Sequence, residues 1–324
     1  MPIDIIQLDI DHPQQENITF YYEFTNKSKN RNFQSIDDFI RYKRQEKVLE
    51  VRWDFILKRN NFPIGILTIK NTYQQPEPIY FLHIDLREKG FSNDVKLAVK
   101  GFLEDQKNTH GFQQFIAYES RPFMERFYHE MGGRAVNWLH FFELHVADVG
   151  PELLNAWADK TLLKALDLKL VYYDKIPEKL MCQHAALHTE LSNDIQRMDY
   201  SWTVVKTASY TKNRQQLLAL QGKKMEIGYL MDKDENLIGM TKVVSNPQDS
   251  SKVFQTITGI IKKYRGKGLA KLLKVSMIMR IMQHKGEIKT IETDCLVGND
   301  PMLFINESLG FRRKRGLVEK EIII

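Results

Sequence analysis

The stretch KKYRGKGLAKLL, residues 262–273, places five basic side chains and two glycines directly before an apolar run. The β-branched segment FQTITGII (254–261) precedes it and predicts a strand. Apolar residues from Leu269 to about Gln283 predict a buried helix. A strand, a glycine turn and a helix together favour anion binding, because the first N–H groups of a helix lack partners and glycine allows close approach.

The spacing of this turn excludes two well-known phosphate-binding motifs. RGKGLAK has only two glycines and fits neither a P-loop nor a dinucleotide-binding fingerprint. Taken alone, the pattern Arg-x-x-Gly-x-Ala is also compatible with a basic surface loop before an ordinary helix. The strand before it and the buried helix after it favour a binding turn.

The bulk composition is typical of a soluble protein with room for two domains. The chain has 324 residues, of which 43% are hydrophobic and 27% charged. The amino terminus lacks the basic region of a signal peptide, and the apolar stretch LLKVSMIMRIM is too short to span a bilayer. Cys182 and Cys295 match no metal-ligand spacing. We therefore expect a cytoplasmic protein without a membrane segment or a metal.

Charge is distributed unevenly along the chain. Residues 1–150 hold 19 Lys+Arg and 21 Asp+Glu, whereas residues 151–324 hold 28 and 20. The basic second half is compatible with a phosphorylated small molecule, an acidic membrane surface or a nucleic acid. Nucleic acid is disfavoured because no basic stripe with interleaved aromatic residues and no recognisable binding module occurs.

The chain contains an internal repeat at a difference of 178 residues. Without a gap, DLREKGFSNDVKLAVKGFL (85–103) aligns with KYRGKGLAKLLKVSMIMRI (263–281). This alignment matches Arg87 with Arg265, Gly90 with Gly268, Ser92 with Ala270, Met124 with Met302, Tyr128 with Asn306 and Gly132 with Gly310. Landmarks that keep one spacing over this length predict two copies of one fold.

Secondary-structure signals occur in the same order in both halves. The second half predicts a hairpin at 224–246, strands at 254–261 and 290–297, and helices at 269–283 and 300–310. The first half predicts the strands VRWDFILK, IGILTIK, IYFLHIDL and FQQFIAY, and helices from Asn93 and from Arg121. Each half is therefore expected to be an α/β (α+β) domain with a mixed sheet. The polar region at 150–166 predicts domains of 1–155 and 166–324.

Two segments resemble one family. TGIIKKYRGKGLAKLL (258–273) resembles the acyl-CoA-binding segment of the GCN5-related N-acetyltransferases (GNAT), whose signature is Gln/Arg-x-x-Gly-x-Gly/Ala. NDPMLFINESLGF (299–311) resembles the second signature, the helix and Leu-Gly-Phe turn after the fifth strand. The doubled arrangement resembles tandem acetyltransferases such as mycothiol synthase. The resemblance implies two tandem acyl-CoA N-acyltransferase folds over nearly the whole chain, although its strong motifs lie only in residues 254–311.

The resemblance implies a cofactor site in the second half, with acetyl-CoA as cosubstrate and no metal. Backbone N–H groups of the turn would hold the pyrophosphate of CoA, and the end of the preceding strand would bind the pantetheine arm. The residues implied are Arg265, Gly266, Lys267, Gly268, Leu269 and Ala270 for the pyrophosphate, Ile260 and Ile261 for pantetheine, and Asn299 and Asn306 near the acyl end.

Charge around the turn distinguishes the halves. Lys262, Lys263 and Lys271 add to the basic turn of the second half, whereas Glu88 and Asp94 accompany the matching turn of the first. Carboxylates at a helix N-terminus stabilise the helix but repel a bound phosphate. We therefore expect the second half to bind acetyl-CoA and the first to be a degenerate GNAT-like domain that is structural or shapes the substrate site.

The general acid and base are less clearly indicated. Many family members use a tyrosine five residues before the phenylalanine of Leu-Gly-Phe to protonate the departing thiolate. Here that position is Asn306, which cannot deliver a proton at neutral pH. The first half keeps Tyr128, for which a half-buried aromatic on an amphipathic helix is the favoured interpretation. Glu292 and Asp294 share one face of a strand and are the best candidate bases, with solvated carboxylates as the alternative.

Other reactive side chains give weaker signals. Cys295 as a covalent nucleophile is disfavoured because no histidine lies near it in the sequence. His184 and His188 are four residues apart and could form half of a metal site, but a substrate-facing or solvated helix surface is favoured because no third ligand is apparent.

These observations predict an acetyl-CoA-dependent N-acetyltransferase that acts on a primary amine of a small molecule or a peptide. The acceptor would lie in the groove between the halves. The alternative is a catalytically silent CoA-binding sensor or scaffold, which Asn306 favours. Acetyl-CoA binding without turnover of any amine would indicate that alternative.

Overall fold

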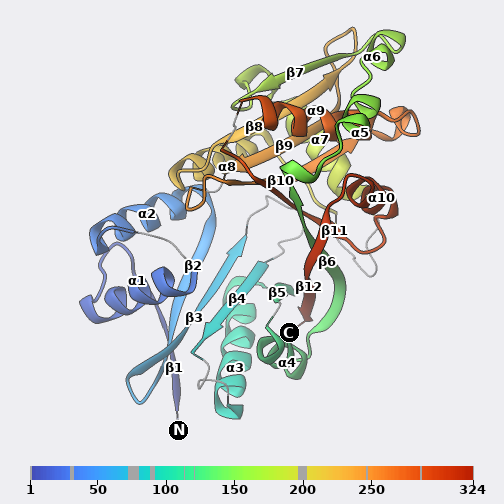
Figure 1. Cartoon of the computed structure of the whole chain (residues 1–324). Helices are drawn as coiled ribbons and strands as arrows, with labels where there is room; N and C mark the ends of the chain where they lie inside the picture. The colour runs from blue at the N-terminus through green and yellow to red at the C-terminus, as the bar shows by residue number, and fades with distance from the viewer. Residues whose placement is uncertain are drawn as a thin grey trace. The chain divides into compact units, whose positions relative to one another are not determined.

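A computed structural model of the chain describes residues 2–29, 33–71, 80–87, 92–112, 114–119, 121–195, 203–245, 247–284 and 287–323. The chain divides into two compact units (Figure 1). Unit 1 comprises Met1–Asn137 and Leu317–Ile324, and unit 2 comprises Trp138–Gly316. Each unit has a mixed sheet with packed helices, so the predicted α/β class and the doubled fold are confirmed.

Unit 1 has the strand order β1-β2-β3-β4-β5-β12. Its elements are β1 (Ile3–Gln7), α1 (Gln15–Lys29), α2 (Ile36–Leu49), β2 (Val51–Arg59), β3 (Phe62–Asn71), β4 (Tyr80–Leu86), α3 (Asn93–His110), β5 (Gln114–Glu119) and α4 (Pro122–Glu130). The strand β6 (Arg134–His145) follows α4 and continues into unit 2.

Unit 2 has the strand order β6-β11-β10-β9-β8-β7. Its remaining elements are α5 (Pro151–Trp157), α6 (Thr161–Ala165), β7 (Lys169–Tyr173), α7 (Met181–Asn193), α8 (Ala208–Leu220), β8 (Met225–Met231), β9 (Leu237–Ser245), β10 (Lys252–Ile260), α9 (Leu269–His284), β11 (Thr290–Leu296) and α10 (Asp300–Ser308). Short 3-10 turns occur at Val146–Asp148, Glu178–Leu180 and Lys262–Tyr264. The last strand, β12 (Arg312–Ile323), extends from unit 2 into unit 1.

Each unit contains one parallel strand pair among its described strands, β4–β5 in unit 1 and β10–β11 in unit 2. A parallel pair requires a crossover, and here α3 and α9 provide it. The other described pairs are antiparallel. The same topology in both units explains why landmarks of the two halves align.

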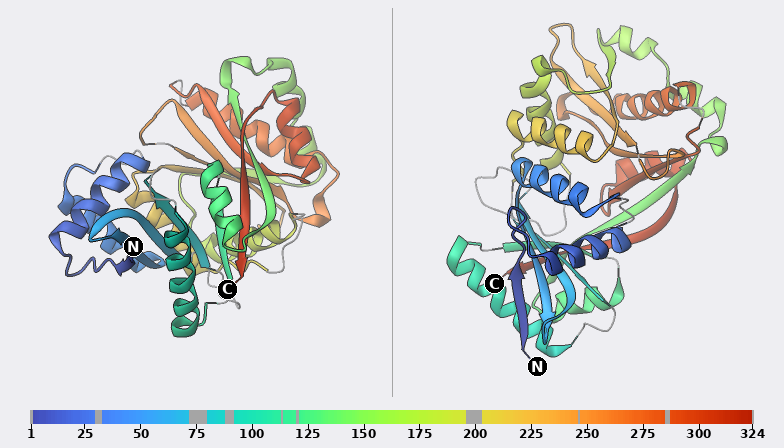
Figure 2. Two further views of the ribbon diagram at one scale, coloured as in Figure 1. Left: turned by 90° about the horizontal axis from the view of Figure 1, so that it is seen from below. Right: turned by 90° about the vertical axis from the view of Figure 1, so that its left-hand side faces the viewer.

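Both faces of each sheet are covered by helices. In unit 1, Tyr21 of α1 and Phe39 of α2 pack with Ile56 and Ile66 on one face, and α3 and α4 cover the other. In unit 2, the yellow-green and yellow helices α7 and α8 lie on one side of the strands and the orange-red helix α9 on the other (Figure 2). Every residue of β8 is buried, and because successive side chains point to opposite faces, the strand packs against both helical layers.

The last strand of each sheet comes from a distant part of the chain. In unit 1, β12 pairs antiparallel with β5, from Val318 opposite Glu119 to Ile323 opposite Gln114. In unit 2, β6 pairs antiparallel with β11. Each half of the chain therefore contributes a strand to the sheet of the other unit.

The region around 150–166, from which the domain boundary was predicted, contains two short helices. Leu154 of α5 and Leu163 of α6 are buried in the core of unit 2. The compact units divide at Asn137 and at Gly316 instead, because the long strands β6 and β12 pass from one unit to the other.

Candidate active site

Strands β10 and β11 separate before either of them ends. Their parallel pairing runs from Lys252 opposite Thr290 to Gln255 opposite Thr293, and the Thr293 hydroxyl donates to the Gln255 carbonyl at 2.9 Å. β10 then continues to Ile260 and β11 to Leu296 without further pairing to each other in the described residues, while each stays paired with its other neighbour. The register of β10 against β9 also shifts between Gln255 and Ile257. Such bulges bend a strand and often accompany active sites. We call this opening the unit 2 gap.

The backbone of β10 presents polar groups to this gap. The Ile261 N–H donates to Ile238 O at 2.9 Å, toward the β9 side. Because directions alternate along an antiparallel strand, the N–H groups of Thr258 and Ile260 point to the opposite side, toward the gap. The Ile260 carbonyl accepts from Arg265 Nε at 2.9 Å. Of the two isoleucines implied for pantetheine, Ile260 therefore has its free N–H on the gap side and Ile261 does not.

The glycine turn after β10 has the backbone that a close-fitting anion site needs. Gly266 and Gly268 have φ of 75° and 80°, the left-handed region that favours glycine. A Cβ at Gly266 would meet no atom within 4 Å, so open space surrounds this part of the turn. α9 begins at Leu269, and the first i→i−4 bond after the turn runs from Leu272 N to Gly268 O. The N–H groups of Leu269, Ala270 and Lys271 precede that bond and can receive an anion.

Positive charge surrounds this turn. Lys262, Lys263 and Lys267 are exposed, and the ammonium groups of Lys263 and Lys267 lie 5.7 and 5.6 Å from the centre of the Tyr264 ring. Lys271 Nζ lies 4.7 Å from the Trp157 ring centre. Arg265 is paired with Asp194 at 2.5 Å and contributes less net charge. The exposed lysines are placed to attract a polyphosphate.

A buried polar cluster lies beside the gap. Asp294 is the first β11 residue beyond the last β10–β11 pair, and burial raises its pKa to about 6. Lys274 of α9 is almost fully buried, with Nζ 4.8 Å from the Phe311 ring centre, and burial lowers its pKa to about 7. Asp294 and Lys274 each favour the charged form of the other. A carboxylate that titrates near neutral pH at the edge of an opening is suited to accept a proton.

The two candidate bases differ in position. Glu292 lies within the paired part of β11, opposite Phe254, with Lys252 Nζ at 3.8 Å. Asp294 lies beyond the point of separation. The geometry therefore favours Asp294 over Glu292 as the residue that faces the gap region.

Cys295 does not have the properties of a nucleophile. Its side chain is buried, and burial raises the pKa of the thiol to about 12. The thiolate is the reactive form, so a thiol in this environment is inert at neutral pH.

The repeat places Asn306 and Tyr128 at the same point of their helices. Gly133 N donates to Tyr128 O at 2.8 Å, and Phe311 N donates to Asn306 O at 3.0 Å, while Gly132 and Gly310 both have positive φ. Tyr128 is buried rather than half-buried, and its hydroxyl accepts from the Ile84 N–H of β4 at 3.2 Å. Asn306 is fully buried, and its side-chain nitrogen and oxygen have no hydrogen-bond partner.

The residues before these helices also correspond. Arg121 O accepts the N–H groups of residues 124 and 125, and Asn299 O accepts those of residues 302 and 303. The Arg121 guanidinium binds Glu119 at 2.8 Å, Asp85 at 2.7 Å and the Ile84 carbonyl at 3.3 Å. The Ile84 N–H thus donates to Tyr128, and the Ile84 carbonyl accepts from Arg121. In unit 2, two asparagines stand at the positions of these larger side chains.

The ungapped alignment of the halves is wrong at the strand and the turn. Arg87 N donates to Ile64 O, as Ile261 N donates to Ile238 O, so the strands correspond at a difference of 174 and not 178. Arg87 thus occupies the place of Ile261 and not of Arg265. Ile84 corresponds in the same way to Thr258, whose N–H faces the unit 2 gap. The predicted counterparts Glu88, Lys89 and Gly90 lie outside the described residues.

Charge at the start of α3 is also more balanced than the sequence suggested. Asp94 pairs with Arg59 at 3.2 Å. In the described residues of unit 1 the β4–β5 pairing likewise stops, at Phe81 opposite Ile116, before either strand ends. Repulsion by Asp94 is therefore a weaker reason for unit 1 to exclude CoA than the occupation of this opening by Tyr128 and Arg121.

The histidine pair of α7 is not a solvated surface. His184 is buried, and its Nδ1 lies 2.8 Å from the Tyr229 hydroxyl. The described residues contain no group of three or more His, Cys, Asp or Glu that could hold a metal. None of the described helices is long and apolar enough to cross a bilayer.

Sequence reasoning missed two lysines inside apolar elements, the buried Lys274 and the half-buried Lys242. Lys274 interrupts the apolar run of α9, and Lys242 interrupts the apolar strand β9. A lysine inside an apolar element is unusual, because burial of an ammonium group is costly. A lysine within an apolar stretch can be recognised in the sequence and could have indicated both residues.

Comparison with known proteins gives similarity of structure only. No protein-family model and no curated protein matches the chain. A tandem GNAT protein from the clavulanic acid biosynthesis pathway matches over 98% of this chain and 98% of its own, with a TM-score of 0.72 and 14% identity. A GCN5-related glucosamine N-acetyltransferase region of a fungal multi-domain GH3 β-N-acetylglucosaminidase matches over 98% of this chain and 38% of its own (TM-score 0.66, 10% identity). A GCN5-related N-acetyltransferase from Sphaerobacter thermophilus matches over 98% and 95% (TM-score 0.53, 10% identity).

Proposed function

From the tandem GNAT fold of this chain, we propose that unit 2 is an acetyl-CoA-dependent N-acetyltransferase and that unit 1 binds no CoA. The observation that carries the proposal is the contrast between the two strand openings. In unit 1, Tyr128 and Arg121 hydrogen-bond to the N–H and the carbonyl of Ile84. In unit 2, Asn306 stands in place of Tyr128 and Asn299 in place of Arg121. An asparagine is too short to reach as far, so the β10 backbone remains available.

The proposed cofactor site follows the course of the chain. The N–H groups of Thr258 and Ile260 would bind the pantetheine arm as an added strand binds a sheet edge. Residues 265–270 would hold the pyrophosphate through their N–H groups, assisted by the exposed lysines. Asn299 and Asn306 would lie near the acyl end, and the unpartnered amide of Asn306 can donate to an oxygen there.

In the proposed reaction, a primary amine of a small molecule or a peptide attacks the thioester carbonyl. Asp294 accepts the amine proton, directly or through water, and the tetrahedral intermediate collapses with release of the CoA thiolate. Backbone donors at the gap stabilise the oxyanion. No tyrosine protonates the leaving group in this scheme, since Asn306 occupies that position.

A catalytically silent CoA sensor or scaffold is the second candidate. Asn306 favours it, because the position lacks an ionisable acid. Acetyl-CoA binding without acetylation of any amine across a broad panel would support this candidate.

Calorimetric titration of the whole chain with acetyl-CoA tests the proposal. One site per chain is expected, and Gly268→Glu should abolish it, because that change adds a carboxylate and a side chain at positive φ in the phosphate turn. Gly132→Glu is the matched control: this exposed glycine of unit 1 also has positive φ, and its Cβ would meet no atom within 4 Å.

Each possible outcome of this titration leads to a different conclusion. Two sites in the wild-type protein would contradict the assignment of unit 1. Absence of binding would contradict the proposed function as a whole. Loss of the site in both glycine variants would show that folding, and not the phosphate turn, is affected.

A further inference from the structure

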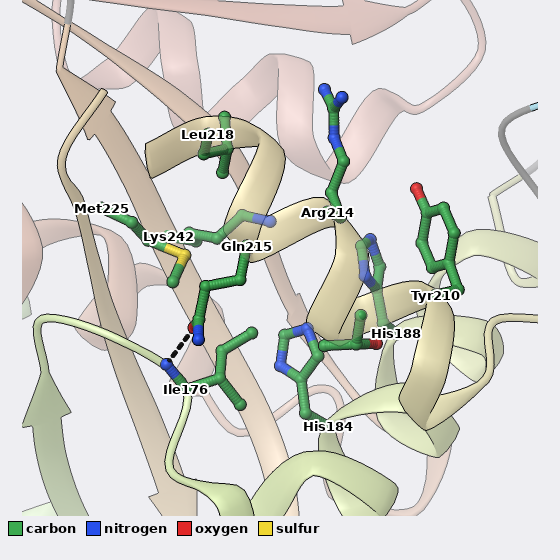
Figure 3. Close-up of a pocket in the computed structure, with 10 residues that line it drawn as sticks. Ile176, His184, His188, Tyr210, Arg214, Gln215, Leu218, Met225 and Lys242 are labelled. Carbon is green, nitrogen blue, oxygen red and sulfur yellow. Dashed lines mark hydrogen bonds between the residues drawn. The ribbon is translucent and has the colours of Figure 1, made fainter. Parts of the chain in front are cut away.

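A small pocket in unit 2 is lined by α7, α8 and the strands β8 and β9 (Figure 3). It encloses about 20 Å³ of free space, enough for a group about the size of a water molecule. His184 and His188 line it from α7, Thr211 and Arg214 from α8, and Lys242 from β9. The exposed guanidinium of Arg214 points away from the other lining side chains (Figure 3). None of these residues belongs to the proposed acetyl-CoA site.

The polar lining of this pocket is cationic or neutral. Lys242 is half-buried, and burial together with Arg214 lowers its pKa to about 8, so it stays charged at neutral pH. Burial lowers the pKa of His184 to about 3 and that of His188 well below its ordinary value, and Lys206 and Lys242 add to both shifts. Both histidines are therefore neutral donors or acceptors beside two cations.

No carboxylate balances these charges. Within the residues that the structure describes, neither Lys242 nor Arg214 forms an ion pair with an acidic side chain. Thr211, which lines the pocket, is 4% exposed, and its buried hydroxyl has no hydrogen-bond partner. A buried hydroxyl without a partner and a half-buried ammonium group without an anion both carry a cost that a bound anion would reduce.

Unit 1 provides an internal comparison at the corresponding place. Thr68 is the counterpart of Lys242 at the strand difference of 174, and it donates to Asp54 at 2.7 Å. Asp54 also pairs with Lys43 and with Arg52, each at 2.9 Å. In unit 1 a carboxylate of the chain itself thus balances the cations between the sheet and its two helices. Opposite Lys242 on the neighbouring strand, unit 2 has Ile227 instead.

The pocket is next to the gap. Lys242 lies directly opposite Ile257 in the β9–β10 register, and Ile257 is the residue after the bulge of β10. Directly opposed residues of neighbouring strands are about 5 Å apart. An anion bound at Lys242 would therefore lie one strand away from the backbone that faces the proposed acyl group.

We propose that this pocket binds a carboxylate of the acceptor, so that the substrate is an amine that also carries an acidic group. The carboxylate would receive hydrogen bonds from Lys242 and Thr211 and would supply the negative charge that Asp54 supplies in unit 1. The binding site is argued from the pocket itself. The statement that its ligand is the acceptor rests on the proposed acetyl-transfer function.

Binding is tested with succinate on the whole 324-residue chain labelled with ¹⁵N-histidine, at constant ionic strength. We expect the imidazole signal of His188 to shift and saturate with succinate but not with succinamide, its uncharged analogue. Lys242→Met and Thr211→Val should each weaken succinate binding, Lys242→Met by tenfold or more. Lys212→Met is the matched control. Lys212 lies on α8 next to Thr211, is exposed and pairs with Glu178 at 3.4 Å.

The same variants separate this inference from the proposed function. Lys242→Met should leave the acetyl-CoA affinity within twofold of the wild-type value, which also shows that it folds. Equal shifts with succinate and succinamide, or unchanged succinate affinity in Lys242→Met, would overturn the inference whatever acetyl-CoA does. If the wild-type protein binds no acetyl-CoA, the proposed function is overturned, but the anion site is not.

Activity supplies the last comparison, with pairs of amino acids and their carboxamides as acceptors. We expect the wild-type protein to prefer each acid over its amide in kcat/KM by tenfold or more, and Lys242→Met to lose that preference. Acetylation of acids and amides at equal rates would show that the pocket does not hold the acceptor.

Discussion

At the scale of single residues, the two halves differ most at the position shared by Tyr128 and Asn306. The tyrosine hydroxyl reaches the β4 backbone, whereas the shorter asparagine has both polar side-chain atoms buried and unpartnered. An unsatisfied buried amide destabilises a fold, and such costs are typical of functional positions. The proposed contact with the acyl group would give the Asn306 amide the partner that it lacks in the free protein.

This cost predicts the effect of Asn306→Leu. Removal of a buried amide without partners should raise the free energy of unfolding by about 1–3 kcal/mol. Acetyl transfer should fall at the same time, because the donor near the acyl oxygen is lost. Chemical denaturation and steady-state kinetics measure the two effects. A less stable variant would mean that the amide makes bonds in the free protein.

The titration of Asp294 predicts the pH dependence of the reaction. Burial raises its pKa to about 6, so the carboxylate that accepts a proton forms as the pH rises through 6. We expect kcat/KM to be half-maximal near pH 6 and to level off above about pH 7, where nearly all of the Asp294 carboxyl is ionised. Asp294→Asn should lower kcat/KM at pH 7.5 by about 10²–10⁴-fold. Glu292→Gln is the comparison, and a larger loss there would transfer the role to Glu292.

At the scale of secondary-structure elements, α4 and α10 begin alike and have different consequences. α4 carries Tyr128 and is preceded by Arg121, and together these side chains occupy the opening between β4 and β5. α10 carries Asn306 and is preceded by Asn299. The Asn306 side chain makes no hydrogen bond to the strands at the corresponding opening between β10 and β11. One helix completes a structural unit, and the other borders the proposed site.

The structural role of α4 predicts the behaviour of Tyr128→Phe. Loss of the hydroxyl leaves the buried Ile84 N–H without a partner and should cost about 1–3 kcal/mol of stability. Acetyl-CoA affinity and acetyl transfer should stay unchanged. Denaturation and activity assays on the same preparation test this, and a large loss of activity with little loss of stability would identify Tyr128 as catalytic.

At the scale of the whole molecule, the two units are not consecutive segments of the chain. The last residues of β12 belong to unit 1, where Glu319, Lys320, Glu321 and Ile322 are buried. Glu319 accepts from Asn137 at 2.6 Å, and Glu321 pairs with Arg134 at 2.5 Å. A strand from the end of the chain thus completes the sheet formed by its beginning.

This exchange predicts the effect of a short truncation. A chain that ends at Gly316 lacks the partner of β5, which then becomes an exposed sheet edge. Hydrogen exchange should accelerate in β5 and α4 of unit 1, whereas α9 and acetyl-CoA binding in unit 2 should change little. Unaltered protection of β5 would show that β12 contributes nothing to unit 1.

The local features of this protein could be predicted from its residues alone. The strand and helix of residues 254–284, the turn at Gly266 and Gly268 and the doubled fold follow from periodicity, glycine conformation and repeated landmarks, which act over a few residues. The contacts that distinguish the units join distant residues: Tyr128 meets Ile84 across 44 positions, and Lys242 meets Arg214 and His188 in one pocket. The exchanged strands, the occupied opening of unit 1 and the unbalanced cations of unit 2 depend on such long-range packing. Local pattern does not determine it, because the same tyrosine or lysine is compatible with a core, a surface or a site until its partners are known.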